Sequence, residues 1–285
     1  LMIMNGPLSG TSLPGVSRLE ICARSPLTGI WGHANSGGSF GPALKRSGYD
    51  GIIFEGTSPS PVYLSIIEGN AQIRDAGRLW GKIVPETEDL LQDAWDAPLT
   101  IASIGPAGEN LVRYAAIMNN KHRAAGRCGL GAVMGAKRLK AISVRGSGRM
   151  TLAQPEIVHS IGRAIARAYA EDGESGPLNF YGDIEQYNRI LAEAGDGCAR
   201  RHACTEGCVT PCVAYMQDVP GAVHERTWSG DWVCVGTRFE GFPQDGSTLR
   251  SVYDWQLPRR AAFELSVLSN RYGLNQADLI TGMVP

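Results

Sequence analysis

The chain has 285 residues, of which 43 % are hydrophobic, and this is enough to bury the core of one large domain or two ordinary ones. The formal net charge of -1, without any block of Lys and Arg, excludes the electrostatic pattern of a nucleic-acid-binding or membrane-surface protein. The sequence has no apolar run of membrane-spanning length and no signal-peptide pattern at its N-terminus.

Cysteine and glycine are the informative residues of the composition. Seven cysteines, an odd number without a secretion signal, argue against a disulfide framework, so we expect a cytoplasmic protein with reduced thiols. The 36 glycines are nearly double the average usage of roughly 7 %. Because the chain is otherwise normally hydrophobic, this glycine content predicts backbone packed closely against a ligand.

The first half of the chain has the pattern of a sheet-rich domain. Polar and apolar residues alternate over residues 18–24, with Leu19, Ile21 and Ala23 on one face, as in a half-buried strand. Turn-rich loops are expected at residues 5–15 and 32–39. Further strands are expected at residues 51–55, 62–68, 71–74, 99–104 and 141–144, and helices at 40–46 and 85–95.

The second half of the chain predicts helices. An apolar stripe of Ile157, Ile161 and Ile165 indicates a helix over residues 155–171. Two more helices are expected at residues 184–194 and 259–272, the last one stopped by Gly273. We therefore predict an α+β protein, with a sheet-rich domain at residues 1–148 and the start of a mainly helical, truncated domain at residues 149–285.

Residues 126–137 form the densest glycine segment. Gly131 and Gly135 would leave backbone N–H groups available to an anion, as in a phosphate-binding loop. The segment is no Walker motif, because no Gly-Lys-Ser/Thr follows, and a glycine-rich packing turn is the alternative interpretation. Residues 35–38 form a similar loop, and the two loops together would provide two sides of one anion site.

Three cysteines, Cys204, Cys208 and Cys212, follow one another at intervals of four residues. Gly207 and Pro211 argue against a regular helix and for a loop that wraps a metal or an iron–sulfur cluster. Zinc requires a fourth ligand, for which Cys198 and His202 are candidates, but the absence of any CxxC pair disfavours zinc. Three buried thiols on a helix face are the structural alternative.

Eight segments resemble, in order, those of one known family. They are residues 6–11 (GPLSGT), 25–29 (SPLTG), 34–38 (ANSGG), 45–50 (KRSGYD), 61–64 (PVYL), 75–81 ending in LWG, 104–110 (IGPAGEN) and 125–141 (AGR through KA). Together they resemble the tungsten-containing aldehyde ferredoxin oxidoreductase family. The resemblance is dense over about residues 5–148 and is limited to two motifs beyond them.

This resemblance implies an N-terminal sheet domain that seats a bis-pyranopterin cofactor of tungsten or molybdenum. It implies that Arg18 bridges the cofactor and an iron–sulfur cluster, and that backbone carbonyls at Asn35 and Ala132 hold a magnesium ion. The motif Asn270–Asn275 is similar to a pterin-contacting motif of the family, with amides in place of both acids. The expected cofactor-binding residues are Arg18, Asn35, Ser36, Gly37, Gly131, Ala132, Val133, Gly135, Asn270, Gly273, Leu274 and Asn275.

The resemblance also assigns Cys204, Cys208 and Cys212 to a [4Fe–4S] cluster. Their spacing is CxxxCxxxC, whereas the family usually has CxxCxxxC. The fourth ligand would lie in a second pterin motif downstream, so the chain is expected to be the middle part of a longer protein. A family glutamate near the metal would correspond to Glu225 or Glu240, our two candidate catalytic residues.

The implied function is the oxidation of an aldehyde, or another oxo substrate, to a carboxylic acid. Electrons would leave through the [4Fe–4S] cluster to a ferredoxin-like carrier in an anaerobic cytoplasm. One alternative is a relative with another substrate, such as an aromatic acyl-CoA that is reduced. A non-enzymatic, zinc-stapled scaffold is the other alternative. We expect no nucleic-acid partner and no membrane span, and a homodimer stays open.

Overall fold

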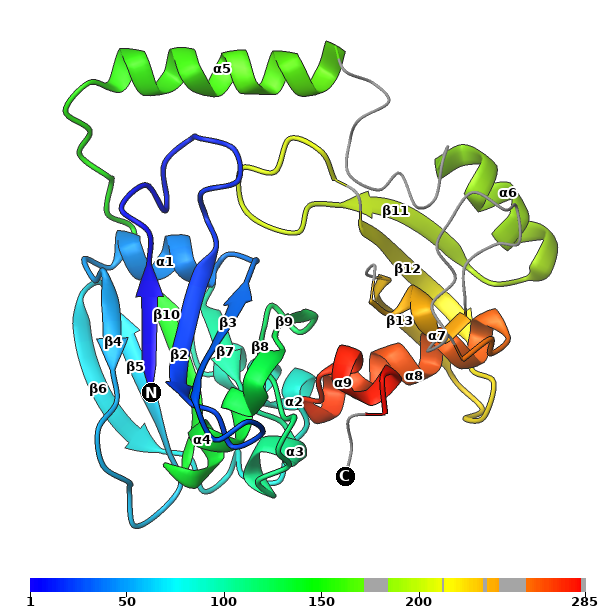
Figure 1. Cartoon of the computed structure of the whole chain (residues 1–285), viewed down its shortest axis with the longest axis horizontal. Helices are drawn as coiled ribbons and strands as arrows, with labels where there is room; N and C mark the ends of the chain where they lie inside the picture. The colour runs from blue at the N-terminus through cyan, green and yellow to red at the C-terminus, as the bar shows by residue number, and fades with distance from the viewer. Residues whose placement is uncertain (172–183, 212, 233–234, 241–254, 283–285) are drawn as a thin grey trace. The chain divides into compact units, whose positions relative to one another are not determined.

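The computed structural model describes residues 1–171, 184–211, 213–232, 235–240 and 255–282, which form two compact units (Figure 1). Unit 1 comprises Leu1–Glu171, Thr205–Val209 and Asn270–Asn275. Unit 2 comprises the described residues of Asp172–Cys204, Thr210–Ser269 and Gln276–Pro285. Two short segments from late in the sequence thus belong to the N-terminal unit.

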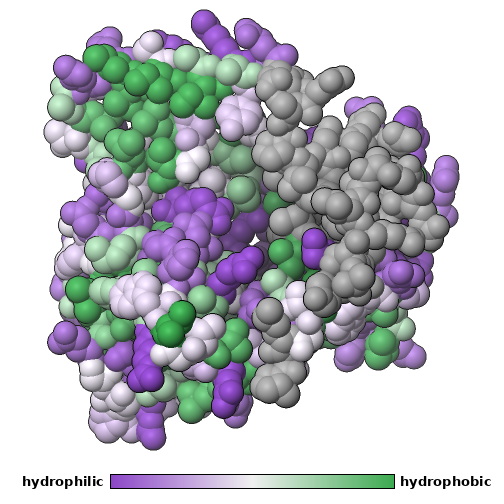
Figure 2. Space-filling view, in the orientation of Figure 1, coloured by the Kyte–Doolittle hydropathy of each residue, from purple (hydrophilic) through white to green (hydrophobic). Residues whose placement is uncertain are grey.

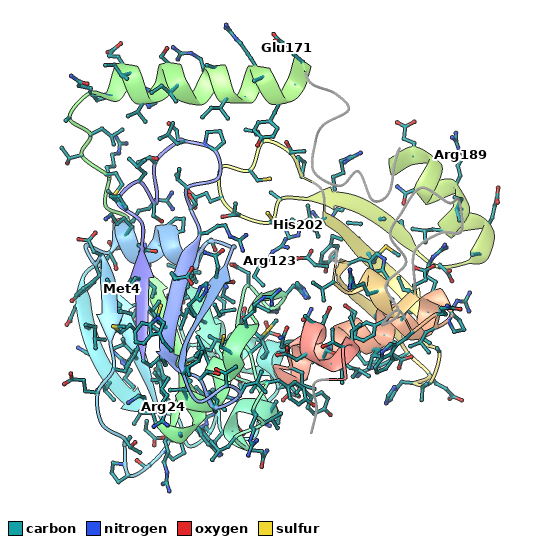
Figure 3. All side chains as sticks on the ribbon, in the orientation of Figure 1. Met4, Arg24, Arg123, Glu171, Arg189 and His202 are labelled. Atoms are coloured by element: carbon teal, nitrogen blue, oxygen red, sulfur yellow. The ribbon has the colours of Figure 1, made fainter. Side chains whose placement is uncertain are left out.

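A four-stranded antiparallel sheet, in the order β3-β2-β1-β4, begins unit 1. Its alternating residues give it one buried and one exposed face, because Leu19 and Ile21 point into the core while Met4 and His33 lie on the other side. Figure 3 labels Met4 on this exposed face. The strands are β1 (Met2–Asn5), β2 (Leu19–Arg24), β3 (Trp31–Ser36) and β4 (Gly51–Ile53).

A six-stranded mixed sheet, in the order β6-β5-β10-β7-β8-β9, forms the second layer of unit 1. Only β5 and β10 pair in parallel, and every other pair is antiparallel. The strands are β5 (Val62–Ile67), β6 (Asn70–Asp75), β7 (Thr100–Ser103), β8 (Ile117–Asn119), β9 (Arg123–Ala125) and β10 (Leu139–Arg145).

The central strand β10 is buried on both faces. Ile142 and Val144 join the core shared with the four-stranded sheet and two helices, α1 and α4. Ala141 points the other way and packs with Leu91 of α2. The helices of unit 1 are α1 (Phe40–Arg46), α2 (Val84–Asp93), α3 (Pro106–Glu109), the 3₁₀ turn η1 (Arg127–Gly129), α4 (Leu130–Ala136) and α5 (Pro155–Glu171).

Helix α5 packs lightly on the rest of unit 1. Gly162, its buried residue, approaches the loop at Leu13, whereas Ile157 and Ile161 are about half exposed. Figure 2 shows hydrophobic surface over this helix. The sequence therefore places the helix correctly, but its apolar stripe is not covered by the described residues.

Unit 2 combines a three-stranded antiparallel sheet, in the order β11-β12-β13, with helices. Its core contains Trp228 and Trp232 of the sheet packed with Phe263 of α8. The elements are α6 (Ile184–Ala194), β11 (Cys198–His202), β12 (Val213–Pro220), β13 (Thr227–Trp232), α7 (Thr237–Glu240), α8 (Arg259–Tyr272) and α9 (Gln276–Ile280).

The α+β fold class is confirmed, and the helices at 40–46, 155–171, 184–194 and 259–272 have the expected bounds. One expectation was wrong. Residues 31–36 form strand β3 and not part of a loop, because their small residues pair in register with β2. The mainly helical part also contains a three-stranded sheet that the sequence did not predict. The boundary at residue 148 stays a prediction. Among the described residues, no helix is both long and apolar enough to cross a bilayer.

A buried carboxyl group makes the stability of unit 1 depend on pH. Glu88 of α2 is 7 % exposed and accepts a hydrogen bond from the backbone N–H of Lys121 at 2.9 Å. Burial raises the pKa of Glu88 to about 8. Between the ordinary value of 4.5 and about 8 the folded chain therefore holds a proton that the unfolded chain has lost, so stability falls as pH rises.

We expect the free energy of unfolding to decrease by about 3–5 kcal/mol between pH 5 and 9 through this group. Urea unfolding across that range measures it. Glu88→Gln, which keeps the acceptor without the titration, should flatten the profile. Glu86→Gln, at the start of the same helix, should not. A profile equally steep in Glu88→Gln would contradict the assignment.

Candidate functional site

Four polar side chains gather where β2 and β3 pair. Glu20 and Asn35 are cross-strand partners, and the Asn35 amide donates to Glu20 Oε2 at 3.0 Å. The Arg18 guanidinium donates to Asn35 Oδ1, and His33 Nδ1 lies 2.6 Å from Glu20 Oε1. All four side chains belong to the exposed face of the sheet, because the strand period brings alternate residues to that side.

The loop after β3 rests on the β8–β9 hairpin. Asn119 Nδ2 donates to Ser36 Oγ at 2.8 Å and to the Arg123 carbonyl at 3.3 Å. Asn120 Oδ1 accepts from the backbone N–H of Ser39 at 2.9 Å. This hairpin, labelled at Arg123 in Figure 3, was missed in the sequence because its strands have three residues each.

Gly38 closes this loop with a left-handed backbone, at φ +86°. A Cβ atom at Gly38 would lie 2.1 Å from Asn119 Oδ1, so no other residue fits. Asn119 Oδ1 is itself buried without a hydrogen-bond partner among the described residues. A buried acceptor without a partner needs a donor, which a ligand or a water molecule would supply.

The glycine segment 126–137 is a helix start packed against backbone. The Gly131 N–H donates to the Ala115 carbonyl at 2.9 Å. A Cβ atom at Gly135 would lie 1.9 Å from the Gly108 carbonyl oxygen. The expectation that Gly131 offers its N–H to an anion is therefore wrong, and the packing-turn interpretation fits both glycines.

Ala132 and Val133 lie within α4, where carbonyls accept the hydrogen bonds of their own helix. Ala132 is buried with Ala107 and Ala115. Asn35, by contrast, is a residue of strand β3, and Gly37 directly follows that strand. The assignment of a magnesium ion to Asn35 and Ala132 stays a prediction.

The motif Asn270–Asn275 packs into unit 1. Leu274 forms an isolated antiparallel bridge with Ala115, and the Gly273 carbonyl accepts from the Ala116 N–H at 2.8 Å. Gly273 has φ +74°, as expected for a residue that ends a helix. Asn270 and Asn275 are both buried, and a Cβ atom at Gly126 would lie 2.8 Å from Asn275 Oδ1. The structure thus brings the motif against the start of the glycine segment.

The cysteine segment contacts the loop after β3. Thr205 bridges Gly38 in parallel, and its Oγ1 donates to the Gly38 carbonyl at 3.4 Å. Glu206 forms a two-point ion pair with Arg46 of α1. Cys208 belongs to unit 1 and Cys204 to unit 2, whereas Cys212 lies outside the described residues. The cluster-ligand assignment therefore stays a prediction.

The two candidate glutamates lie in different surroundings within unit 2. Glu225 is exposed in the turn between β12 and β13. Glu240 of α7 accepts from Arg259 Nε at 3.1 Å, and burial raises the pKa of this carboxyl. Neither assignment as a catalytic residue is tested by this arrangement.

Two histidine–carboxylate pairs in unit 2 were missed in the sequence. His202 Nδ1 lies 2.6 Å from Asp231 Oδ1, and Asp231 is 1 % exposed. In the second pair, His224 Nδ1 contacts Glu264 Oε1. Burial acts to raise the pKa of Glu264, but hydrogen bonds from the His224 side chain and from the backbone N–H groups of Ala222, Val223 and His224 lower it to about 2. The partners are 29 and 40 residues apart, so spacing gives no signal for them.

Comparison with known proteins assigns the family. A family model described as "Aldehyde ferredoxin oxidoreductase, N-terminal domain" matches residues 1–146, about half of the chain. The chain belongs to the aldehyde ferredoxin oxidoreductase family. The Pyrococcus abyssi protein named "Tungsten-containing aldehyde ferredoxin oxidoreductase" is 50 % identical over 197 residues, covering 68 % of this chain and 32 % of that relative.

Two further relatives show how wide this aldehyde ferredoxin oxidoreductase family is. A Thermococcus kodakarensis protein of the same name is 54 % identical over 157 residues, covering 55 % of this chain and 26 % of the relative. The "Aliphatic sulfonate oxidoreductase, WOR-like subunit" of Pyrococcus furiosus is 42 % identical over 163 residues, covering 52 % and 26 %. The matches thus span a third or less of each relative's length.

One solved structure is similar over almost the whole chain. It is the "Active site complex BamBC of Benzoyl Coenzyme A reductase in complex with 1,5 Dienoyl-CoA", with a TM-score of 0.78 and 26 % identity. The match covers 97 % of this chain and 45 % of that chain. The family likeness therefore continues past the N-terminal domain.

Proposed function

We propose that the complete protein oxidises an aldehyde to a carboxylic acid on a tungsten or molybdenum bis-pyranopterin cofactor. A [4Fe–4S] cluster would pass the electrons to a ferredoxin-like carrier. The observation that carries the proposal is the glycine loop after β3, with Arg18 and Asn35 on one side and the Asn119 acceptor beneath it. It lies in the part of the chain that matches the family.

The residues present fit a polar, anionic cofactor. Arg18 offers a guanidinium and Ser36 a hydroxyl, while Asn119 Oδ1 is an acceptor for a ring or amino N–H. When bound, the metal would accept the two electrons of the oxidation. Arg18 would bind and orient the cofactor's anionic groups, and the Gly37–Gly38 backbone would allow a close approach.

The cysteine segment supports the position of the cluster. Thr205 and Glu206 are held at Gly38 and Arg46, and they lie between the first two candidate ligands, Cys204 and Cys208. Ligands on such a segment would keep the cluster beside the glycine loop. Arg46 is then a residue that positions the segment through Glu206.

Metal analysis tests this proposal. We expect complete protein expressed anaerobically with tungstate to contain tungsten or molybdenum together with iron, and to be brown. Arg18→Gln should lower the tungsten content per chain, whereas Arg24→Gln, at the other end of β2, should retain it. A preparation with neither metal and no iron would refute the proposal.

A second candidate is the reduction of an aromatic acyl-CoA. It is favoured by the similarity over 97 % of the chain to the benzoyl-CoA reductase complex, and by amides at Asn270 and Asn275 where family members have acids. A parallel assay of aldehydes and acyl-CoA thioesters separates the two reactions. Turnover of acyl-CoA without turnover of any aldehyde would select the second.

A further inference from the structure

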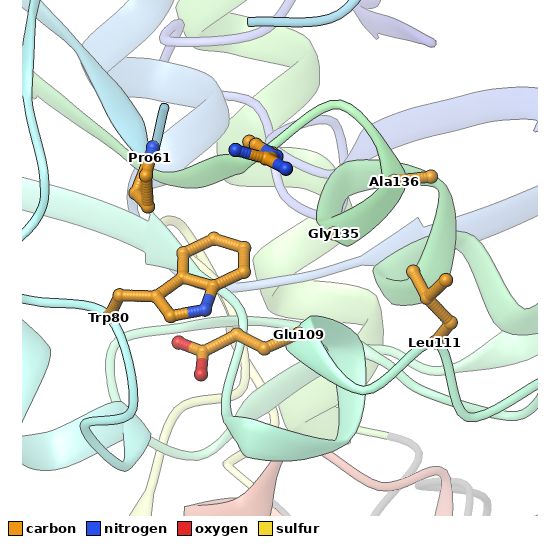
Figure 4. Close-up of a pocket in the computed structure, with 7 residues that line it drawn as sticks. Pro61, Trp80, Glu109, Leu111, Gly135 and Ala136 are labelled. Carbon is orange, nitrogen blue, oxygen red and sulfur yellow. The ribbon is translucent and has the colours of Figure 1, made fainter. Parts of the chain in front are cut away.

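A pocket of about 460 Å³ opens on unit 1, and Gly135 is the one member of the expected cofactor-binding set among its lining residues. Figure 4 shows Pro61, Trp80, Glu109 and Leu111 around it. Gly135 and Ala136 of α4 and Arg138, directly before β10, complete the lining. The volume lies within the range of about 300–1,000 Å³ that is typical of small-molecule sites. Pro61 and Leu111 supply apolar walls, and the half-buried indole of Trp80 supplies an aromatic one.

The lining carboxylate is not available to a ligand. Glu109 Oε1 accepts from Lys140 Nζ at 2.5 Å, and Glu109 Oε2 accepts from the Gly81 N–H at 2.8 Å. The Glu109 side chain is 5 % exposed and that of Lys140 is fully buried. The pair is therefore internally neutralised, and it leaves no acceptor for a ligand on this wall.

The remaining polar groups of the lining are donors. The Trp80 indole N–H has no hydrogen-bond partner among the described residues. The Arg138 guanidinium uses one nitrogen to bind the Pro59 carbonyl, and no acidic side chain in the described part of the chain pairs with it. When the buried Lys140 behind the wall is counted against Glu109, the groups around the pocket carry one net positive charge, that of Arg138. With the Trp80 indole N–H they offer two sets of donors, which match an anion that has an apolar body.

The backbone around the pocket is held in an unusual conformation. Leu111 and Arg138 have φ of +58° and +54°, in the left-handed region that side-chain-bearing residues rarely adopt. The Arg138 N–H is fixed to the Gly135 carbonyl at 2.8 Å, and this bond directs the chain from α4 into β10. This conformation fixes where the backbone presents the Arg138 side chain at the rim of the pocket.

We propose that this pocket binds a small aromatic carboxylate. The carboxylate would accept from the Arg138 guanidinium and the Trp80 indole N–H, and the ring would pack on Trp80, Pro61 and Leu111. Binding here does not depend on the activity proposed above. Metal content and benzoate binding are separate measurements, so one proposal can fail while the other stands.

Benzoate is the probe. The chain has six tryptophans, so labelling with 5-fluorotryptophan gives six ¹⁹F resonances, and Trp80→Phe assigns that of Trp80. We expect benzoate to shift the Trp80 resonance saturably, with a dissociation constant of about 1 mM or below. Benzyl alcohol, which has the ring without the charge, and acetate, which has the charge without the ring, should each bind at least tenfold more weakly.

Arg138→Gln should weaken benzoate binding at least tenfold while the other five tryptophan resonances stay in place. Arg24→Gln is the matched control, because Arg24 is also exposed and also donates to one backbone carbonyl, that of Gly29. Its benzoate affinity should be unchanged. An absent or non-saturable shift at Trp80 would overturn the proposal, as would equal affinity for benzyl alcohol or full affinity in Arg138→Gln.

Discussion

Gly135→Ala is expected to destabilise unit 1 by about 3 kcal/mol or more, because an added methyl group in a packed interior forces backbone to move. The new Cβ atom would lie 1.9 Å from the Gly108 carbonyl oxygen, and a rigid carbonyl cannot give way as the end of a side chain does. Alanine would favour the helix itself by roughly 1 kcal/mol, so the measured loss understates the clash. Urea unfolding measures the difference.

Gly6→Ala is the control for this substitution. A Cβ atom added at Gly6 would have no neighbour within 4 Å, and Gly6 does not have a left-handed φ. Its replacement should therefore change stability by less than about 0.5 kcal/mol. A Gly135→Ala protein as stable as Gly6→Ala would show that α3 and α4 do not approach at these two glycines. The close packing of the glycine segment would then need another explanation.

Lys140→Met is expected to cost about 3–5 kcal/mol, because removing one partner of a buried ion pair leaves an uncompensated charge. The Lys140 ammonium is fully buried and binds both Glu109 and the Lys82 carbonyl. Burial lowers the pKa of Lys140, so the neighbouring carboxylate is what favours its charged form. Thermal unfolding at pH 7 measures the loss.

The double variant Lys140→Met/Glu109→Gln separates charge from packing. Once the carboxylate is gone, methionine fills the ammonium site without an unpaired ion, so we expect most of the stability to return. If the double variant is as unstable as Lys140→Met, the loss comes from packing around β10 and not from the charge of Glu109.

Local sequence patterns predicted the elements that are defined by their own periodicity or by a terminating residue. The stripe of Ile157 and Ile161 gives the helix over 155–171, and Gly273 ends the last long helix, as the structure has it. Strand β3 was missed because its residues are small and polar, and only pairing with β2 makes them a strand. The sheet of unit 2 was missed as well, although each of its strands pairs with its neighbour along the chain.

The candidate site shows the same division. Arg18 and Asn35 were found through motifs, and the structure joins them by a hydrogen bond. Asn119, which supports their loop, carries no motif, because its role comes from a β8–β9 hairpin that sequence patterns did not reveal. The sequence also left open why Gly131 and Gly135 are glycines. The reason shows only in the structure, where the backbone of residues 108 and 115 lies against them.

The bridge between Leu274 and Ala115 has a consequence for what counts as the N-terminal domain. The family match ends at residue 146, but the folded unit 1 also contains the segments Thr205–Val209 and Asn270–Asn275 from later in the sequence. A protein cut after Glu171 would leave the Ala116 N–H and the Tyr114 carbonyl without the partners that Gly273 and Asn275 provide. We expect a synthetic peptide carrying the Asn270–Asn275 motif to bind such a shortened protein in trans, at residues 114–116, where the same motif binds in the intact chain.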